Sequence, residues 1–358
     1  MLVTTMSRDI LIPAEVQRLL DARAPVIIGL SGGKDSTAVA WAVSQALLDY
    51  AGPKLLLHAD LGSTEWLDSW PSCQRIAERT GWELASCTRS AGGMMERWES
   101  RWASSKRRYC AMETVTVVLP WSTPAMRFCQ SELKVAPITS LIKRRFGKVP
   151  VLNVTGVRGE ESAARSKQPV CAPVAKLPPG SLAWRPIHHW TEEDVWAEIA
   201  ASGIKPHEAY SLFGSSRVSC RFCILANEAD LRASLKDPAA AAIYVRMCDL
   251  ELASGFAFQG SRWLTSLAPD LVPNGLERLG TAQSLAAHRN KAQGWVPKHL
   301  QFTKGWPHCV PTAEESRKLA EMRRSICAFY EWESPYLDES TVRQRYQELW
   351  DIKHQQLY

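Results

Sequence analysis

The residues with the clearest chemical potential lie in the sequence SGGKDS, from Ser31 to Ser36, directly after the apolar stretch VIIGL. Gly32 and Gly33 permit positive φ angles and let backbone amides approach an anion closely. Lys34 adds a full positive charge, and the two serines add hydroxyl donors. A helix that begins after such a loop directs its N-terminal amides at the bound anion. The segment therefore predicts a phosphate-binding loop.

Two features separate this loop from the common nucleoside-triphosphate loop. The spacing of its glycines and lysine is not that of the Walker motif. Asp35 is also unexpected in a site that holds only an anion. Its carboxylate would either cap the following helix or bring a magnesium ion to the phosphates.

A second group of charged residues follows the apolar stretch at residues 149–157. Arg158 and Arg165 could each clamp a phosphate or sulfate, because a guanidinium forms two parallel hydrogen bonds to such groups. The alternative is a surface ion-pair network with Glu160 and Glu161.

The chain has ten cysteines, and most are expected to be small buried side chains without disulfides. Cys220 and Cys223 differ because they form a C-x-x-C pair, which suits a redox pair or half of a zinc site. No second C-x-x-C completes a zinc ribbon.

The elements that must position these residues alternate between apolar strands and amphipathic helices. Because the strands are apolar almost throughout, they predict an α/β fold with a parallel sheet covered by helices on both faces. Ligands of such sheets bind at the carboxyl ends of the strands. The expected strands lie at residues 25–30, 54–60, 82–88 and 149–157.

The second half of the sequence has a different pattern. Thr191 and Asp194 have the spacing of a capping box, and Gly203 is a natural helix end. The segment KLPPGSLAWRP, at residues 176–186, is expected to be a loop. We therefore expect a nucleotide-binding α/β domain at residues 1–205 and a mainly helical region at residues 206–358 that carries the C-x-x-C pair.

Composition gives weaker indications. The net charge of +6 is mildly basic, no apolar run is long enough to span a bilayer, and the N-terminus does not resemble a secretory signal. A cytoplasmic protein without membrane partners is therefore expected. Basic clusters at residues 106–108 and 143–148, with Trp98, Trp102 and Trp121 near the first, would suit a nucleic acid, although solvated helix faces are the simpler explanation.

The loop SGGKDS matches the signature of the PP-loop ATP pyrophosphatase superfamily. Further segments resemble, in order, the phosphoadenosine phosphosulfate (PAPS) reductase-like branch: LLLHADLGSTEW, FCQSELKVAPI, GVRGEESAAR, WRPIHHWTEEDVW and GSSRVSCRFC. The resemblance covers about residues 25–225. It implies an adenine-nucleotide alpha-hydrolase-like, Rossmann-like sheet that binds ATP or adenylyl sulfate.

This resemblance also implies roles for particular residues. Lys34, Asp35 and Arg158 would be catalytic, and Asp60 would lie near the nucleotide or its Mg²⁺. The implied nucleotide-binding set is Ser31, Gly32, Gly33, Lys34, Asp35, Ser36, Asp60, Gly156, Arg158, Glu161 and Arg165.

Adenylyl-sulfate reductases of this family carry two adjacent cysteines in the segment that here reads FCQSELK, and these hold a [4Fe-4S] cluster together with the later pair. Here Phe128 precedes Cys129, so the resemblance implies three metal ligands, Cys129, Cys220 and Cys223. The fourth ligand is not identified; Cys110, Cys248 and Cys309 are candidates. A cluster held by three cysteines leaves one iron open to a sulfur donor. Zinc, or buried free thiols, are the alternatives.

Two departures from the reductases guide the expected activity. Their attacking cysteine lies in a C-terminal Glu-Cys-Gly-x-His segment, whereas this sequence ends in ELWDIKHQQLY. Reductases of PAPS also usually depart from SGGKDS. The resemblance is therefore strongest to sulfur-transfer proteins of DNA phosphorothioation. In this hypothesis ATP adenylylates an acceptor, such as a DNA phosphate, pyrophosphate leaves, and sulfur displaces AMP.

Such a mechanism implies a sulfur-donor protein, for example a cysteine desulfurase. The alternatives are a sulfonucleotide reductase and an ATP-binding, nucleic-acid-associated module with a structural metal. A sulfate-adenylylating subunit is disfavoured because it has no need of the three cysteines.

Overall fold

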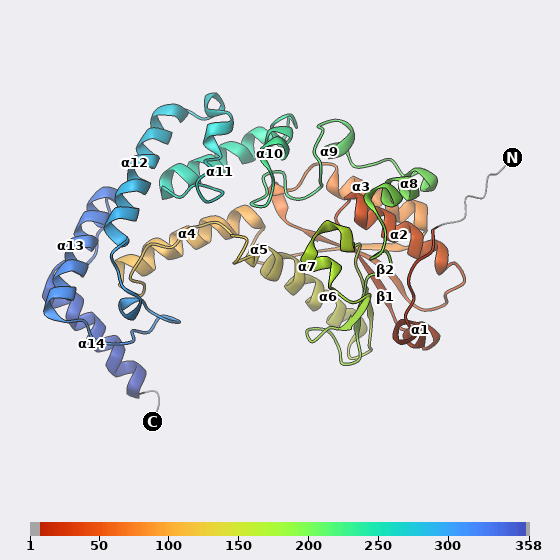
Figure 1. Ribbon diagram of the computed structural model, residues 1–358, viewed down its shortest axis with the longest axis horizontal. Coiled ribbons are helices and arrows are strands. Elements are labelled where there is room, and N and C mark those ends of the chain that lie inside the picture. Colours follow the sequence, from red (N-terminus) through yellow and green to blue (C-terminus); the bar gives the residue numbers. More distant parts are fainter. Residues whose placement is uncertain (1–7, 356–358) are drawn as a thin grey trace. The chain divides into compact units, whose positions relative to one another are not determined.

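The computed structural model describes residues 8–355, which form two compact units. Unit 1 comprises the residues up to Met95 together with Pro124–Tyr244, and unit 2 comprises Glu96–Thr123 and the residues from Val245 onward. The chain passes between the units three times: within the helix α4 (Met94–Cys110), between Thr123 and Pro124, and within the helix α11 (Ala240–Ser254) (Figure 1). The expected boundary after residue 205 lies inside unit 1, so the C-x-x-C pair belongs to the same unit as the sheet.

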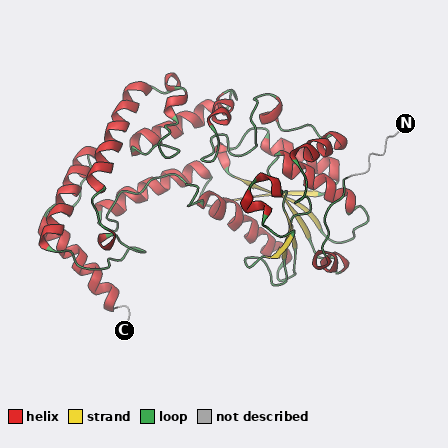
Figure 2. Ribbon diagram, in the orientation of Figure 1, coloured by secondary structure: helices red, strands yellow, loops and turns green. Residues whose placement is uncertain are grey.

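The core of unit 1 is a six-stranded sheet in the order β3-β2-β1-β4-β6-β5 (Figure 2). All neighbouring strands are parallel except β5 and β6, which confirms the expected α/β class. The strand order reverses direction between β1 and β4, which is where ligands bind to open α/β sheets. The strands are β1 Val26–Leu30, β2 Lys54–Asp60, β3 Glu83–Thr88, β4 Leu152–Val154, β5 Cys171–Pro173 and β6 Leu182–Trp184.

Both faces of the sheet are buried, which explains the unbroken apolar strands. Ile28 of β1 belongs to a core that includes residues of α2 (Lys34–Ala46), α3 (Ser69–Thr80) and α8 (Glu192–Ser202). Its neighbour Ile27 belongs to a second core with residues of α6 (Ala136–Phe146). Successive side chains of a strand point to opposite faces, so an apolar residue is needed at each position.

Some local expectations differ from the structure. The segment expected to be a loop at residues 176–186 contains β6, which pairs with β4 and β5. The strand expected at residues 149–157 is reduced to β4, three residues long. Strands this short carry too few residues for an alternating or continuous apolar pattern to be recognised.

The helix α8 begins as its sequence predicts. The amide of Asp194 donates to the Thr191 hydroxyl at 3.1 Å, and the amide of Thr191 donates to the Asp194 carboxylate at 2.8 Å. Gly203 ends the helix with a φ of 72°. Because α8 packs against α2, this cap places Glu192 beside the loop that precedes α2.

A continuous helical segment, α5–η2–α6, contains the cysteine-lysine-proline motif. Its middle section, η2, is a π-helix, Ser131–Val135. Pro137 has no amide proton to donate, so the regular helical hydrogen bonding is interrupted there. The remaining elements of unit 1 are α1 Ala14–Asp21, η1 Gly62–Thr64, α5 Phe128–Gln130, η3 Gly159–Glu161, α7 Ala163–Ser166, α9 Glu208–Ser211 and α10 Glu228–Leu235.

Unit 2 is helical in the part that the structure describes, apart from loops and two isolated bridges. Besides parts of α4 and α11 it contains η4 Thr265–Leu267, η5 Pro269–Leu271, α12 Gly275–Gln293, η6 Lys298–Leu300, α13 Ala313–Tyr330 and α14 Glu339–Gln355. Its core includes Tyr109, Leu319 and Tyr346. No helix within residues 8–355 combines the length and apolarity needed to cross a bilayer.

The tryptophans expected near the basic cluster are core residues of unit 2. Trp98 and Trp121 are 2% and 0% exposed, and their rings pack edge-to-face with centroids 5.3 Å apart. Trp102 packs against Phe256 and Trp332. Buried rings do not offer a free face to a base, so Trp98 and Trp121 do not support the nucleic-acid interpretation.

Candidate functional site

The predicted phosphate loop lies between the end of β1 and the start of α2. Gly32 adopts a φ of +75°, and a Cβ there would lie 3.0 Å from the Cβ of Ser72. The Ser31 amide donates to the Ser36 hydroxyl at 3.2 Å, and that hydroxyl donates to the carbonyl of Gly33 at 2.9 Å. The loop is therefore a closed turn that depends on glycine at its tightest point.

Lys34 is the first residue of α2 and is 8% exposed. Its Nζ lies 3.3 Å from the Asp35 carboxylate and 3.9 Å from that of Glu192. The positive end of the helix dipole and the ammonium group thus occur together. This combination of charges attracts an anion of phosphate type.

Arg158 connects the β4 end of the sheet to the loop. Its Nε lies 2.7 Å from the Asp35 Oδ1, and its side chain also contacts Glu160 at 2.5 Å. The arginine is 2% exposed. A Cβ on Gly156 would overlap the carbonyl oxygen of Asp35, so the segment after β4 and the start of α2 approach closely only because this residue is glycine.

Glu161 and Arg165, which follow Arg158 in the same segment after β4, form a more exposed pair. Glu161 accepts the backbone amide of Arg158 at 3.0 Å and forms an ion pair with Arg165. The Arg165 side chain is 39% exposed. Arg158 therefore belongs to the buried group around Asp35, whereas Arg165 belongs to a surface pair.

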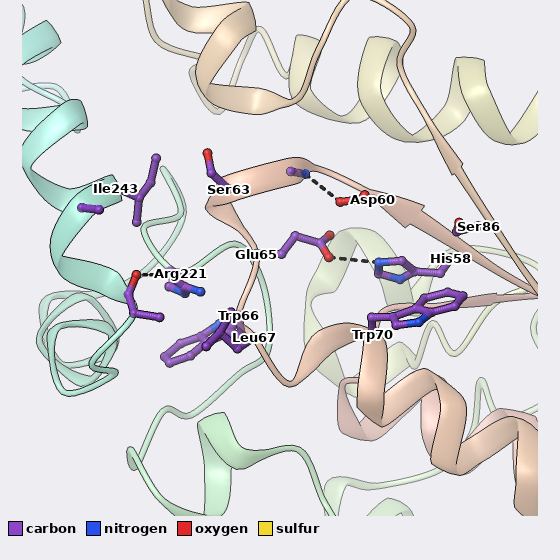
Figure 3. Close-up of a pocket in the computed structure, with 13 residues that line it drawn as sticks. His58, Asp60, Ser63, Glu65, Trp66, Leu67, Trp70, Ser86, Arg221 and Ile243 are labelled. Atoms are coloured by element: carbon purple, nitrogen blue, oxygen red, sulfur yellow. Dashed lines mark hydrogen bonds and ion pairs between the residues drawn. The ribbon is translucent and has the colours of Figure 1, made fainter.

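Asp60 ends β2 and is exposed. Its carboxylate accepts the amide of Gly62 at 2.7 Å. It lies at the edge of a cavity of about 580 Å³, above the ends of β2 and β3 (Figure 3). The cavity is lined by His58, Asp60, Gly62, Ser63, Glu65, Trp66, Leu67, Trp70, Ser86, Arg221, Ala239, Ala242 and Ile243.

His58 joins this cavity to the loop. It is 3% exposed, its Nδ1 lies 3.1 Å from the carbonyl oxygen of Leu30, and its Nε2 lies 2.9 Å from the Glu65 carboxylate. Burial lowers the pKa of His58, but the hydrogen bonds with Cys73 and Glu65 outweigh this effect and raise the pKa to about 10. A protonated ring donates to both oxygens, so His58 acts as a cation that fixes Glu65 in the cavity wall.

The C-x-x-C segment contacts the same region. The Arg221 amide donates to the carbonyl of Thr64 at 2.9 Å, which ties the segment to η1. The Arg221 side chain, 4% exposed, lines the cavity and pairs with Asp237 at 3.0 Å. The cysteine pair thus lies next to the cavity at the carboxyl end of β2.

Of the three cysteines expected as ligands, charge at Cys129 and Cys223 affects the pKa of Cys220. Burial raises the pKa of the Cys220 thiol, negative charge at Cys223, Cys129 and Glu65 adds to this rise, and Lys134 opposes it. Yet among residues 8–355 no three Cys, His, Asp or Glu side chains are grouped closely enough to hold a metal ion. The three cysteines nevertheless share one neighbourhood of unit 1.

Several residues of the site are absent from the sequence-based set. They are His58, Glu65, Trp70, Glu192, Tyr210 and Arg221. His58 interrupts the apolar stretch LLLHAD, and a histidine within a buried strand was the available signal. Tyr210 contacts the loop from a position 176 residues away, and no local pattern reveals such a contact.

The chain is similar to several known proteins. The model of the phosphoadenosine phosphosulfate reductase domain family matches residues 25–226, more than half of the chain. An uncharacterized 37.8 kDa protein of Escherichia phage 186 is 29% identical over 238 residues, which are 57% of this chain and 68% of the phage protein. A solved PAPS reductase from Candida auris, in complex with phosphate, is 17% identical, with a TM-score of 0.39 over 59% of this chain and 88% of the reductase. On the family match, this chain belongs to the phosphoadenosine phosphosulfate reductase domain family.

Proposed function

We propose that this protein uses ATP to adenylylate an acceptor and then transfers sulfur to it. The observation that carries the proposal is the intact loop with Lys34 and Arg158 each paired with one oxygen of the Asp35 carboxylate. Phosphate oxygens are the same kind of partner as a carboxylate. The two cations are thus preorganised to bind phosphates that replace Asp35 as their partner.

The proposed first step is attack of an acceptor oxygen on the α-phosphorus of ATP, with pyrophosphate as the leaving group. Lys34 and the amides at the start of α2 would stabilise the negative charge that develops on pyrophosphate. A sulfur nucleophile at the oxidation level of sulfide then attacks the activated acceptor atom, and AMP leaves. The acceptor exchanges oxygen for sulfur without a change in oxidation state.

Magnesium would neutralise charge on the phosphates. In nucleotide sites this ion is commonly held by one or two carboxylates and the substrate phosphates, rather than by a cage of protein ligands. Asp60 is exposed at the end of β2, and Asp35 would be released when phosphates engage its cations. These two carboxylates are the residues that we assign to the ion.

The cavity beside the loop is the proposed site for the nucleoside. Its volume of about 580 Å³ is within the usual range for small-molecule sites. In the sheet, His58 is paired with Leu30, the residue before the loop. A nucleotide that extends from the loop over β2 would place its base near the Trp70 ring, which is 38% exposed.

The proposed reaction also needs a sulfur donor and an acceptor. Cys129, Cys220 and Cys223 are the proposed sulfur-handling residues, and a [4Fe-4S] cluster on them would supply an iron that binds sulfur. We propose a cysteine desulfurase as the donor, with a thiol reductant that supplies the two electrons needed to release its persulfide sulfur as sulfide. The proposed acceptor is a nucleic-acid phosphate, supported by the basic clusters at residues 106–108 and 143–148.

A second candidate is a sulfonucleotide reductase, which the family description favours. That reaction needs a cysteine that attacks sulfate sulfur. Cys327 is 2% exposed within the core of unit 2, so it lacks the access that such a nucleophile requires. The deciding experiment supplies PAPS or adenylyl sulfate with a thiol reductant and measures sulfite. We expect none, and sulfite at enzymatic turnover rates would refute the sulfur-transfer proposal.

A further inference from the structure

The phenol of Tyr210 lies between the phosphate loop and the cysteine pair. Its hydroxyl oxygen accepts the backbone amide of Lys34 at 3.1 Å and the backbone amide of Val218 at 3.2 Å. Lys34 begins α2, and Val218 precedes Cys220 by two residues. One oxygen atom therefore joins the helix end that would face phosphate to the segment that carries the cysteines.

The position of this hydroxyl is fixed by the surrounding structure. The Tyr210 ring packs edge-to-face on Trp196 of α8, with centroids 5.1 Å apart. Its helix, α9, is held by the amide of Glu208, which donates to Asp68 at 3.0 Å, and by the amide of Ala209, which donates to His207 at 2.9 Å. The phenol is thus supported from both α8 and α3 rather than carried on a free loop.

The hydroxyl also keeps a donor that these two bonds do not use. Both of these bonds employ its oxygen as the acceptor, so neither of them uses the phenolic proton. Burial raises the pKa of Tyr210 to about 12, and the hydroxyl stays protonated at neutral pH. A phosphate at the start of α2 would offer an oxygen acceptor for this proton.

The cysteine segment is anchored on either side of Cys220. Upstream, Val218 is held by Tyr210, and Ser216 is held by Asp230 through bonds of 2.7 and 2.9 Å. Downstream, the Arg221 amide is held by Thr64. Of these anchors, the bond at Val218 is the one whose partner, Tyr210, also contacts Lys34 at the phosphate loop.

We propose that Tyr210 is a positioning residue that couples occupation of the phosphate loop to the placement of Cys220. A bound phosphate accepts the phenolic proton, which holds the hydroxyl, and with it the Val218 amide, in one position. The cysteine segment is then ordered when the loop is filled. This inference rests on the proposed function, because it assumes that the loop binds phosphate.

The test uses pyrophosphate, which is small enough to occupy the loop without filling the neighbouring cavity. Hydrogen exchange is measured for the peptide covering residues 215–223 in the full-length protein, with and without pyrophosphate, and calorimetry measures binding separately. A peptide from α13 in unit 2 serves as the internal reference. In the native sequence we expect pyrophosphate to slow exchange of this peptide by about threefold to tenfold, the effect of one strengthened hydrogen bond.

Tyr210→Phe removes only the hydroxyl. It should still bind pyrophosphate, with affinity weakened by no more than about tenfold, yet lose the protection of residues 215–223. The matched control is Tyr50→Phe, which removes a hydroxyl that donates to the carbonyl of Ala24, just before β1 at the opposite end of that strand. This control should keep the protection.

The results that would refute the coupling differ from those that would refute the proposed function. If pyrophosphate binds the native protein but leaves the exchange of residues 215–223 unchanged, or if Tyr210→Phe is protected as well as the native protein, the coupling is refuted while the proposed function stands. If neither pyrophosphate nor ATP binds, the proposed function fails and the coupling fails with it. The measurement on the native protein decides the question even if Tyr210→Phe does not fold.

Discussion

The guanidinium of Arg158 lies 2.7 Å from the carboxylate of Asp35, although the two residues are 123 positions apart in the chain. This contact joins the loop after β1 to the segment after β4, at the point where the strand order reverses. Asp35 was the unexpected residue of the phosphate loop. Its place between Lys34 and Arg158 explains it, because one carboxylate keeps two buried cations in position.

The first prediction concerns the geometry of this contact. Arg158→Lys keeps the charge but cannot reach both Asp35 and Glu160 with a planar fork. We expect ATP cleavage to fall by about tenfold to a hundredfold and the free energy of unfolding to fall by about 1–3 kcal/mol. Arg165→Lys, at a half-exposed pair, is the control and should change stability by less than about 0.5 kcal/mol. Equal activity of Arg158→Lys and the native protein would contradict this role.

The second prediction concerns the close approach of the segment after β4 to the start of α2. Gly156→Ala places a Cβ against the carbonyl oxygen of Asp35, so the start of α2 must shift. Pyrophosphate binding, measured by calorimetry, should weaken by about tenfold or more without any change of charge. Gly280→Ala, where no atom lies within 4 Å of the added Cβ, should leave binding unchanged and stabilise α12 by about 0.5–1 kcal/mol. Unaltered binding by Gly156→Ala would show that the two loops are not coupled.

The third prediction concerns the pH dependence of stability. The pKa of His58 is raised in the folded protein to about 10 from its ordinary 6.5, so its contribution is fully present below pH 6.5 and is lost as the pH rises toward 10. The stability advantage of the native protein over His58→Asn should therefore shrink across that range in denaturant titrations. Glu65→Gln removes the partner carboxylate and should flatten this dependence. An advantage that grows with pH would mean that His58 is neutral in the fold.

The strands β1 to β4 and the phosphate loop could be predicted from the sequence because they are local patterns, whereas β5 and β6 could not. VIIGL and LLLHAD are apolar at nearly every position, and SGGKDS is contiguous. The partners of the loop could not be predicted in the same way. Glu192 and Tyr210 reach Lys34 only through the packing of α8 and α9, which depends on tertiary structure rather than on residue spacing. The second unit was expected to begin after residue 205, but His207 and Tyr210 tie the following segment to the loop of unit 1.

The fourth prediction concerns the cysteines. Protein purified without oxygen should contain iron and acid-labile sulfide in equal amounts if Cys129, Cys220 and Cys223 hold a [4Fe-4S] cluster. Cys129→Ser should lower the iron content, whereas Cys87→Ser, at a half-buried thiol on β3, should not. A colourless protein that contains zinc would contradict the cluster. Cys129→Ser with its full metal content would remove Cys129 from the ligand set.

The central claim is that this loop serves cleavage of ATP between the α- and β-phosphates, and the products of ATP test it most directly. ATP labelled in the α-phosphate is incubated with the full-length protein, magnesium, a sulfide source and DNA. We predict labelled AMP and free pyrophosphate, a loss of at least about a hundredfold in Lys34→Ala, and little change in Lys54→Ala, at the start of β2. Formation of ADP and phosphate, or full activity in Lys34→Ala, would contradict the account.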